Sequence, residues 1–363
     1  MAKARVLVVD DSAFMRKVIS DMIAEDGAFE VIGTARDGLD ALEKIKRLQP
    51  DVVTLDVEMP RKDGLATLRE IMNTQPVPVI MLSSVTQSGA TATMEALALG
   101  AVDFVPKPSG SISLDIADVR DELIRKLKAA VGAKIQITRP RALPIASTIL
   151  RPKAPTRRPM PVGQITPSND VLIVIGSSTG GPRALEEVIR QLPGDLPAGV
   201  LVIQHMPAGF TRSMAERLDQ IADVRVKEAE DGDRVSGGVV YIAPGDYHMT
   251  VSPEQVIRLE QTPPVNYVRP SIDVTMLTLP PIYSGKLIGV ILTGMGKDGA
   301  EGMAKIKEAG GVTIVQDEYT STIYSMPKAV VESGNADFIL PIDRIGDAVV
   351  RAVGKLKQRV DSR

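Results

Sequence analysis

The chain lacks cysteine and tryptophan altogether, and its 363 residues include only two histidines. The absence of cysteine excludes disulfides, thiolate metal sites and a cysteine nucleophile, and it fits a reducing compartment. Aromatic residues are only 3% of the chain, which argues against a base-stacking platform for nucleic acid. The net charge of -2 gives no general sign of nucleic acid or a membrane surface as partner. The short apolar run at the N-terminus ends in two acids, so we expect no signal peptide, no membrane insertion and a cytoplasmic location.

Branched aliphatic runs alternate with amphipathic stretches along most of the chain. This alternation predicts parallel sheets that are covered by helices on both faces. We therefore predict an α/β fold with two doubly wound domains: a (βα)5 domain over residues 1–125 and a mostly parallel domain over residues 169–363. The predicted strands are VLVVD, FEVIGTA, DVVTLD, PVIML and VDFVPK in the first domain, and VLIVIG, GVLVIQH, VVYIAP, LIGVILTG, GVTIVQ and ADFIL in the second.

The segment between these domains, residues 126–168, has an unusual composition. From Leu123 to Asn169 there are ten basic residues and no acid, and seven prolines lie between Pro140 and Pro167. Proline removes a backbone donor and fixes φ, so we interpret the segment as a linker. A solvated tether is the favoured reading, and a basic strap against an acidic face of a domain or partner is the alternative.

Charged and hydroxyl residues follow several strands of the first domain. Asp10 and Asp11 follow the first strand, Asp56 closes the third, and Ser83 and Lys107 follow the fourth and fifth. The carboxyl ends of parallel strands meet at one edge of a sheet. Three carboxylates there need a counter-charge, which Mg²⁺ and an ammonium group supply. The pattern predicts a site at which a carboxylate accepts a phosphoryl group.

The segments VLVVDDS, TLDVEMPRKDGL, MLSS and FVPKP resemble a response-regulator receiver domain over about residues 4 to 125. The resemblance implies Asp56 as the phosphoacceptor and Ser83, Lys107 and Phe104 as switch residues. It also implies a cis bond between Lys107 and Pro108. The implied Mg²⁺ ligands are Asp10, Asp11, Asp56 and the backbone carbonyl of Glu58.

The second domain opens with VLIVIGSSTGG, in which Gly176, Ser178 and Gly180 fit G-x-S-x-G. A serine on the turn after a buried strand presents its hydroxyl to a base. His205 ends the next apolar strand, and it is therefore favoured as that base over His248, which could still line the site or bind substrate. Asp298 follows a further strand. It fits a helix N-cap as well as a carboxylate that orients an imidazole, and the two roles are compatible.

A competing pattern runs through the same region. Gly294, Gly296 and Gly299 match G-x-G-x-x-G after a strand, and Asp317 ends the next strand, which indicates a dinucleotide site. An acid at position 298 would repel a pyrophosphate at the helix start, and Ser178 would have no role. An NAD-binding oxidoreductase domain fused to a receiver is therefore the alternative function.

The segments GSSTGG, QHMPAGFT, EAEDGDRV, YIAPGDYHM, RPSID and LTGMGKDGAEGM resemble the chemotaxis protein-glutamate methylesterase domain, from about residue 169 to the end. With the receiver, the whole chain resembles the response-regulator methylesterases of the CheB family. The resemblance implies a catalytic triad of Ser178, His205 and Asp298, with Thr179 and Met295 lining the site. Val268 departs from the family, which often has histidine there, and we assign it no role.

This resemblance also implies an activity and its partners. The expected enzyme hydrolyses glutamate γ-methyl esters and deamidates glutamines on methyl-accepting chemotaxis receptors, without a cofactor for that reaction. A chemotaxis histidine kinase is the expected phosphodonor, and nucleic acid is not an expected partner. We further hypothesise that the unphosphorylated receiver docks over the cleft of Ser178, and that phosphate on Asp56, which adds about -1.5 to -2 charge, weakens this docking.

Overall fold

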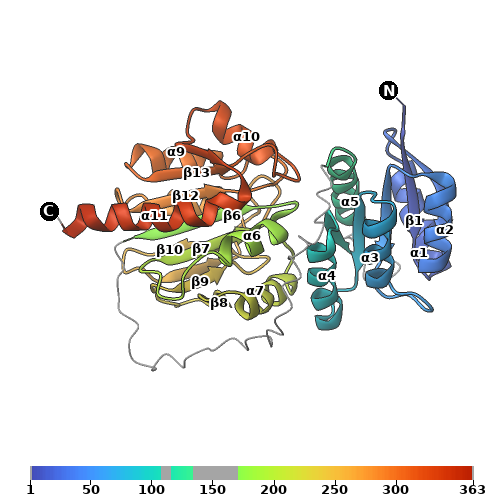
Figure 1. Cartoon of the computed structure of the whole chain (residues 1–363), viewed down its shortest axis with the longest axis horizontal. Helices are drawn as coiled ribbons and strands as arrows, with labels where there is room; N and C mark the ends of the chain where they lie inside the picture. The colour runs from blue at the N-terminus through green and yellow to red at the C-terminus, as the bar shows by residue number, and fades with distance from the viewer. Residues whose placement is uncertain (1, 108–115, 134–170, 362–363) are drawn as a thin grey trace, which may run out of the picture.

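The computed structural model describes residues 2–107, 116–133 and 171–361. The greater part of the predicted linker, and the predicted cis bond between Lys107 and Pro108, lie outside these residues. Two α/β units lie side by side, one around a five-stranded sheet and one around a seven-stranded sheet (Figure 1). The α/β fold class predicted from the alternating pattern is confirmed.

The N-terminal unit is a parallel sheet of order β2-β1-β3-β4-β5, which is the order of a doubly wound fold. Its central strands are buried on both faces, which explains their continuous aliphatic sequences. The strands are β1 (Ala4–Val9), β2 (Phe29–Ala35), β3 (Val52–Asp56), β4 (Val79–Ser83) and β5 (Asp103–Pro106). The helices are α1 (Ala13–Ala24), α2 (Gly38–Leu48), α3 (Gly64–Thr74), α4 (Gln87–Leu99) and α5 (Ile116–Val131).

Side-chain caps begin four of these helices. Ser12, Asp37, Asp63 and Thr86 each accept a hydrogen bond from a backbone N–H in the first turn of the helix that follows. Such caps satisfy donors that would otherwise lack a partner. They fix where the chain turns from strand to helix at the sheet edge that carries the acidic residues.

Helix α5 continues to Val131, past the domain boundary that we predicted at residue 125. Lys126, which we assigned to the linker, is buried, and its Nζ lies 3.2 Å from Asp103 Oδ1 and donates to the Phe104 carbonyl at 2.5 Å. The basic run begins inside a packed helix because Asp103 and Glu122 compensate the charge of Lys126.

The C-terminal unit is a parallel sheet of order β14-β13-β12-β6-β7-β9-β8. Our prediction omitted β8 at its edge and an antiparallel hairpin of β10 and β11 that forms a separate small sheet. The strands are β6 (Leu172–Ser177), β7 (Gly199–Gln204), β8 (Arg225–Glu228), β9 (Val239–Ile242), β10 (His248–Val251), β11 (Ile257–Glu260), β12 (Leu287–Ile291), β13 (Val312–Gln316) and β14 (Phe338–Leu340). The helices are α6 (Gly181–Ile189), α7 (Phe210–Ile221), α8 (Ile272–Thr278), α9 (Ala300–Glu308), α10 (Ser325–Glu332) and α11 (Ile342–Asp361).

The two units meet where α4 of the first packs against α7 and α6 of the second (Figure 1). The rings of Phe104 and Phe210 form the apolar centre of this contact, with their centroids 4.4 Å apart. Both side chains are fully buried, so the interface excludes water at this point. The contact therefore joins β5 to the start of α7.

Candidate active site and phosphorylation pocket

Three adjacent strands bring the predicted triad to one edge of the larger sheet. Ser178 follows β6, His205 follows β7, and Asp298 lies in the turn between β12 and α9, and these strands are neighbours in the order β12-β6-β7. Backbone hydrogen bonds join the three strand ends: the His205 N–H donates to the Ser177 carbonyl, and the Ser178 N–H donates to the Thr293 carbonyl. The strand that carries the serine thus lies between the strand that carries the histidine and the strand before the acid.

His205 and Asp298 are in direct contact. His205 Nε2 lies 2.7 Å from Asp298 Oδ2, and both side chains are more than nine-tenths buried. Burial opposes the charged form of Asp298, but the hydrogen bonds from His205 and from backbone N–H groups outweigh it and lower the pKa of this carboxyl. Asp298 is therefore a carboxylate at neutral pH, and it holds the imidazole from one side.

The other ring nitrogen of His205 is the one available for proton transfer. Within the described residues Nδ1 of His205 has no hydrogen bond, and neither does Ser178 Oγ. In free enzymes such catalytic hydrogen bonds are often long and tighten only with substrate. Because Nε2 is already bound to the carboxylate, Nδ1 is the candidate base for the serine hydroxyl.

Glycines keep the serine turn tight. Gly180 has a φ of +77°, and a Cβ there would lie 2.5 Å from Thr322 Oγ1. Helix α6 begins directly after it, but its first two residues supply no free donor: the Gly181 N–H donates to the Ser178 carbonyl at 2.7 Å, and Pro182 has no N–H. The backbone N–H groups of Thr179 and Gly180, in the turn itself, are the candidate donors for an oxyanion.

Two glycines of the dinucleotide-like pattern have packing roles that need no nucleotide. A Cβ on Gly294 would lie 2.8 Å from the Cβ of Ser178, and a Cβ on Gly299 would lie 2.5 Å from Ile291 Cδ1. These contacts require glycine because the turn packs against the serine and α8. The nucleotide interpretation has no support in the geometry.

The two predicted lining residues behave differently. Thr179 is buried, and its Oγ1 donates at 2.6 Å to Asp103 Oδ2 at the start of β5 in the other unit. Met295 is half-buried in the turn between Thr293 and Asp298. Asp103 was not among the predicted site residues, although an acid beside the apolar residues of the predicted strand VDFVPK was a signal that it has a partner.

The acidic residues of the first unit also converge. Carboxylate oxygens of Asp10, Asp11 and Asp56 all lie within 4.8 Å of one another. Lys107 Nζ bridges two of them, at 2.8 Å from Asp10 Oδ2 and 2.7 Å from Asp56 Oδ2. Burial raises the pKa of Asp56 to about 6, with Lys107 opposing the shift and Asp10 adding to it. This set of hard oxygen donors fits a divalent cation such as Mg²⁺.

The remaining predicted switch positions lie around this pocket. The Glu58 N–H donates to Asp56 Oδ1 at 3.2 Å, while the Glu58 side chain is exposed. Ser83 is buried and faces helix α4: its Oγ donates to the Gly89 carbonyl at 3.1 Å and accepts from Thr93 Oγ1 at 2.7 Å. Phe104 lies at the interface with the second unit, as described above.

Comparisons with known proteins agree with both halves of this description. A family model for the CheB methylesterase matches residues 173–349, and one for the response regulator receiver domain matches residues 6–117. A protein-glutamate methylesterase/protein-glutamine glutaminase of Symbiobacterium thermophilum is 56% identical over 355 residues, which is 97% of each chain. The chain belongs to the CheB methylesterase family.

Other members of the CheB family also match this chain. A protein of the same description from Pyrococcus horikoshii is 48% identical over 97% of this chain and 94% of its own. The crystal structure of the Thermotoga maritima CheB methylesterase catalytic domain is 47% identical and covers 50% of this chain and 98% of that chain, with a TM-score of 0.49. The family models and the full-length relatives confirm the family prediction, and the oxidoreductase alternative has no support.

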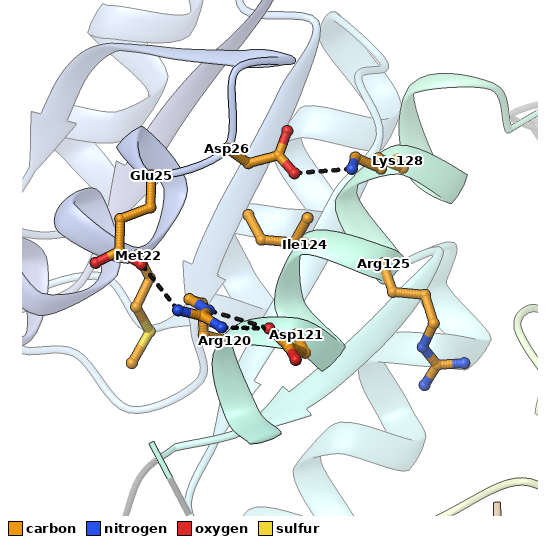
Figure 2. Close-up of a pocket in the computed structure, with 8 residues that line it drawn as sticks. All are labelled: Met22, Glu25, Asp26, Arg120, Asp121, Ile124, Arg125 and Lys128. Atoms are coloured by element: carbon orange, nitrogen blue, oxygen red, sulfur yellow. Dashed lines mark hydrogen bonds and ion pairs between the residues drawn. The ribbon is translucent and has the colours of Figure 1, made fainter. Parts of the chain in front are cut away.

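One further hollow lies away from both candidate sites of this CheB-family chain. A groove of about 570 Å³ runs between α1 and α5, and Figure 2 shows the charged side chains that line it. Arg120 pairs with Glu25 at 3.0 Å and Lys128 pairs with Asp26 at 2.7 Å. Opposite charges neutralise one another there, so the groove has no strong preference for a charged ligand. In the described part of the chain, no helix combines the length and the apolar character needed to cross a bilayer.

Proposed function

We propose that this CheB-family chain hydrolyses γ-glutamyl methyl esters of methyl-accepting chemotaxis receptors with Ser178 as nucleophile, His205 as base and Asp298 as its orienting partner. The contact of 2.7 Å between His205 and Asp298, across the strand that carries Ser178, is the observation that supports this assignment most strongly. Deamidation of receptor glutamines is the same acyl transfer with ammonia as the leaving group.

The reaction follows from the roles of these groups. As Ser178 Oγ attacks the γ-carbonyl carbon, His205 Nδ1 takes the hydroxyl proton, and Asp298 stabilises the resulting imidazolium. The imidazolium then protonates the departing methoxide, so methanol leaves and an acyl-serine remains. Water attacks the acyl carbon in the second half, its proton passes through His205 to Ser178 Oγ, and glutamate is released. Backbone N–H groups of the turn between Ser178 and α6 are the proposed oxyanion donors.

The receiver pocket is the proposed phosphorylation site. We propose that Asp10, Asp11, Asp56 and the Glu58 carbonyl hold Mg²⁺, which supplies positive charge for the phosphoryl oxygens when it is bound. The Asp56 carboxylate attacks the phosphorus of a kinase phosphohistidine, the P–N bond breaks, and the imidazole leaves. Lys107, now shared by Asp10 and Asp56, is placed to contact the transferred oxygens.

Phosphorylation is proposed to loosen the cover over the esterase site. The receiver contacts Thr179, the residue next to the nucleophile, and α4 packs on α7. If Ser83 turns to the phosphoryl group, it gives up its hydrogen bond to the Gly89 carbonyl in the first turn of α4. The interface then loses support on the receiver side, which exposes the rim around Ser178.

The proposed organisation of the chain follows α5. The receiver domain extends to the end of that helix at Val131, the methylesterase domain begins near residue 169, and the basic, proline-rich sequence between them is the linker. We place the enzyme in the cytoplasm, where thiols stay reduced and a chain without cysteine needs no disulfide.

Methanol release from methylated receptor membranes tests the function directly. The wild-type chain is expected to release methanol, with a higher rate after addition of a small-molecule phosphodonor. Ser178→Ala is expected to abolish release under both conditions, because it removes the nucleophile. Ser333→Ala is the matched control, since this exposed hydroxyl lies outside the predicted triad, where it donates to the Val330 carbonyl and accepts from Asn335 Nδ2. Undiminished release by Ser178→Ala would refute the assignment.

A further inference from the structure

Asp298 is held by one short segment of chain. Besides His205 Nε2, its carboxylate accepts hydrogen bonds from Ser271 Oγ at 2.9 Å, from the Ile272 N–H at 2.7 Å and from the Asp273 N–H at 3.2 Å. Three of its four donors thus belong to residues 271–273, at the start of α8. The direction in which Asp298 presents Oδ2 to His205 therefore depends on where this segment lies.

The second histidine of the chain holds this segment in place. His248, on β10, is completely buried, and its Nδ1 accepts the Ser271 N–H at 3.1 Å. Its Nε2 lies 3.2 Å from the Pro263 carbonyl. An acceptor at Nδ1 and a donor at Nε2 define the neutral Nε2–H tautomer. The ring therefore ties together the two ends of the loop between β11 and α8.

These contacts exclude a direct part for His248 in the chemistry. Both ring nitrogens are already in use, and the side chain has no exposed surface, so it cannot reach a substrate. Its one link to the triad runs through Ser271, whose N–H is bound by His248 and whose hydroxyl is bound by Asp298. Resting on the proposed function, we infer that His248 is a positioning residue that aligns Asp298 through Ser271.

The loss of this acceptor has a defined consequence. Without Nδ1 the buried N–H of Ser271 has no partner in the described structure, and a buried donor without a partner is costly. The segment is then expected to shift toward another acceptor and to carry Ser271 Oγ and the neighbouring N–H groups with it. Asp298 would follow its donors, and its bond to His205 would lengthen.

Two substitutions separate the role of the ring nitrogen from that of its volume. His248→Leu fills a similar space but offers no acceptor, whereas the Oδ1 of His248→Asn lies near the position of Nδ1 and can accept the Ser271 N–H. We expect His248→Leu to lower kcat for methanol release roughly tenfold, with KM nearly unchanged, and His248→Asn to recover most of that loss. Thr275→Val is the matched control, because it removes a buried side-chain hydrogen bond from α8 to the Met249 carbonyl of β10 and keeps the backbone bond from Thr275 to the Ser271 carbonyl.

A double-mutant cycle distinguishes positioning from mere structural support. If His248 acts through Asp298, His248→Leu should cost little further activity in an Asp298→Asn background, with a radiolabelled methyl group used to follow these slow variants. The inference would be overturned if His248→Leu lowered activity by the same factor in the wild-type and Asp298→Asn backgrounds. It would also be overturned if Thr275→Val and His248→Leu, at equal thermal stability, lost the same activity. A wild-type chain without methanol release would instead refute the proposed function, whereas full activity of His248→Leu in an active wild-type background would refute only the role of His248.

Discussion

Asp56 and Asp298 are buried carboxylates at the carboxyl edges of the two parallel sheets: Asp56 closes β3, and Asp298 lies in the turn that follows β12. The pKa values of these two carboxyls are shifted in opposite directions. Burial raises the pKa of Asp56 to about 6, and Lys107 only partly opposes this shift. Burial acts in the same direction on Asp298, yet the hydrogen bonds from His205, Ile272 and Asp273 lower its pKa.

The number of donors around each group explains the contrast. Asp56 receives one backbone N–H, from Glu58, and one ammonium, from Lys107, and two further carboxylates lie nearby. Its oxygens therefore retain capacity for a cation and a phosphoryl group. Asp298 has four donors and no such capacity. A carboxylate with few hydrogen-bond donors keeps oxygen lone pairs available and is suited to react. A carboxylate whose oxygens are all hydrogen-bonded is suited to orient its neighbour.

Replacement of each carboxylate by its amide should produce the largest difference. Asp298→Asn is expected to lower kcat for methanol release roughly 10⁴-fold, because an amide does not stabilise the imidazolium of His205. Asp56→Asn is expected to lose only the stimulation by the phosphodonor, since it lies in the other domain. Initial rates with and without phosphodonor measure both effects, and a similar loss of unstimulated rate in the two variants would contradict the comparison.

An intermediate effect is expected at the contact between the domains. Phe104→Ala removes a ring pair whose geometry contributes about 0.5–1.5 kcal/mol beyond its buried area. Because this contact helps the receiver to cover Thr179, the rate without phosphodonor should rise severalfold and the stimulation by phosphodonor should shrink. Phe29→Ala, a buried ring of β2 in the receiver, is the control for general destabilisation. An unchanged or lower basal rate in Phe104→Ala would argue against a covering role.

The smallest effect concerns stability and its dependence on pH. A carboxyl whose pKa is raised by folding favours the folded state below its unfolded pKa of 3.8, and this contribution is lost as pH rises through about 6. Asp56→Asn should therefore raise Tm by a few degrees at about pH 7.5 and by less at about pH 4.5. Thermal unfolding at both pH values checks this, with the exposed Asp21→Asn as control. A larger gain in Tm at the lower pH would show that folding lowers the pKa of Asp56 instead of raising it.

Much of this arrangement could be predicted from the sequence because parallel strands place their carboxyl ends at one edge. That rule grouped Asp10, Asp56 and Lys107, and it placed Ser178 and His205 after adjacent strands. The rule does not predict side-chain contacts between distant segments, because these contacts follow no periodic pattern in the sequence. The position of Lys126 in a buried helix depends on Asp103, and the link between Asp103 and Thr179 joins residues 76 positions apart in sequence.

The sequence by itself determined the two parallel sheets, since continuous aliphatic strands are stable only with both faces covered, and it determined which polar side chains stand at the strand ends. Only the tertiary structure decided which hydrogen-bond and ion-pair partners each acidic side chain has. The orientation of Asp298 depends on Ser271 and His248, which come from a loop and a hairpin with no periodic signal, and the burial of Phe104 depends on the other domain. Hydrogen bonds and docking contacts join distant segments one pair at a time, so they leave little trace in local sequence.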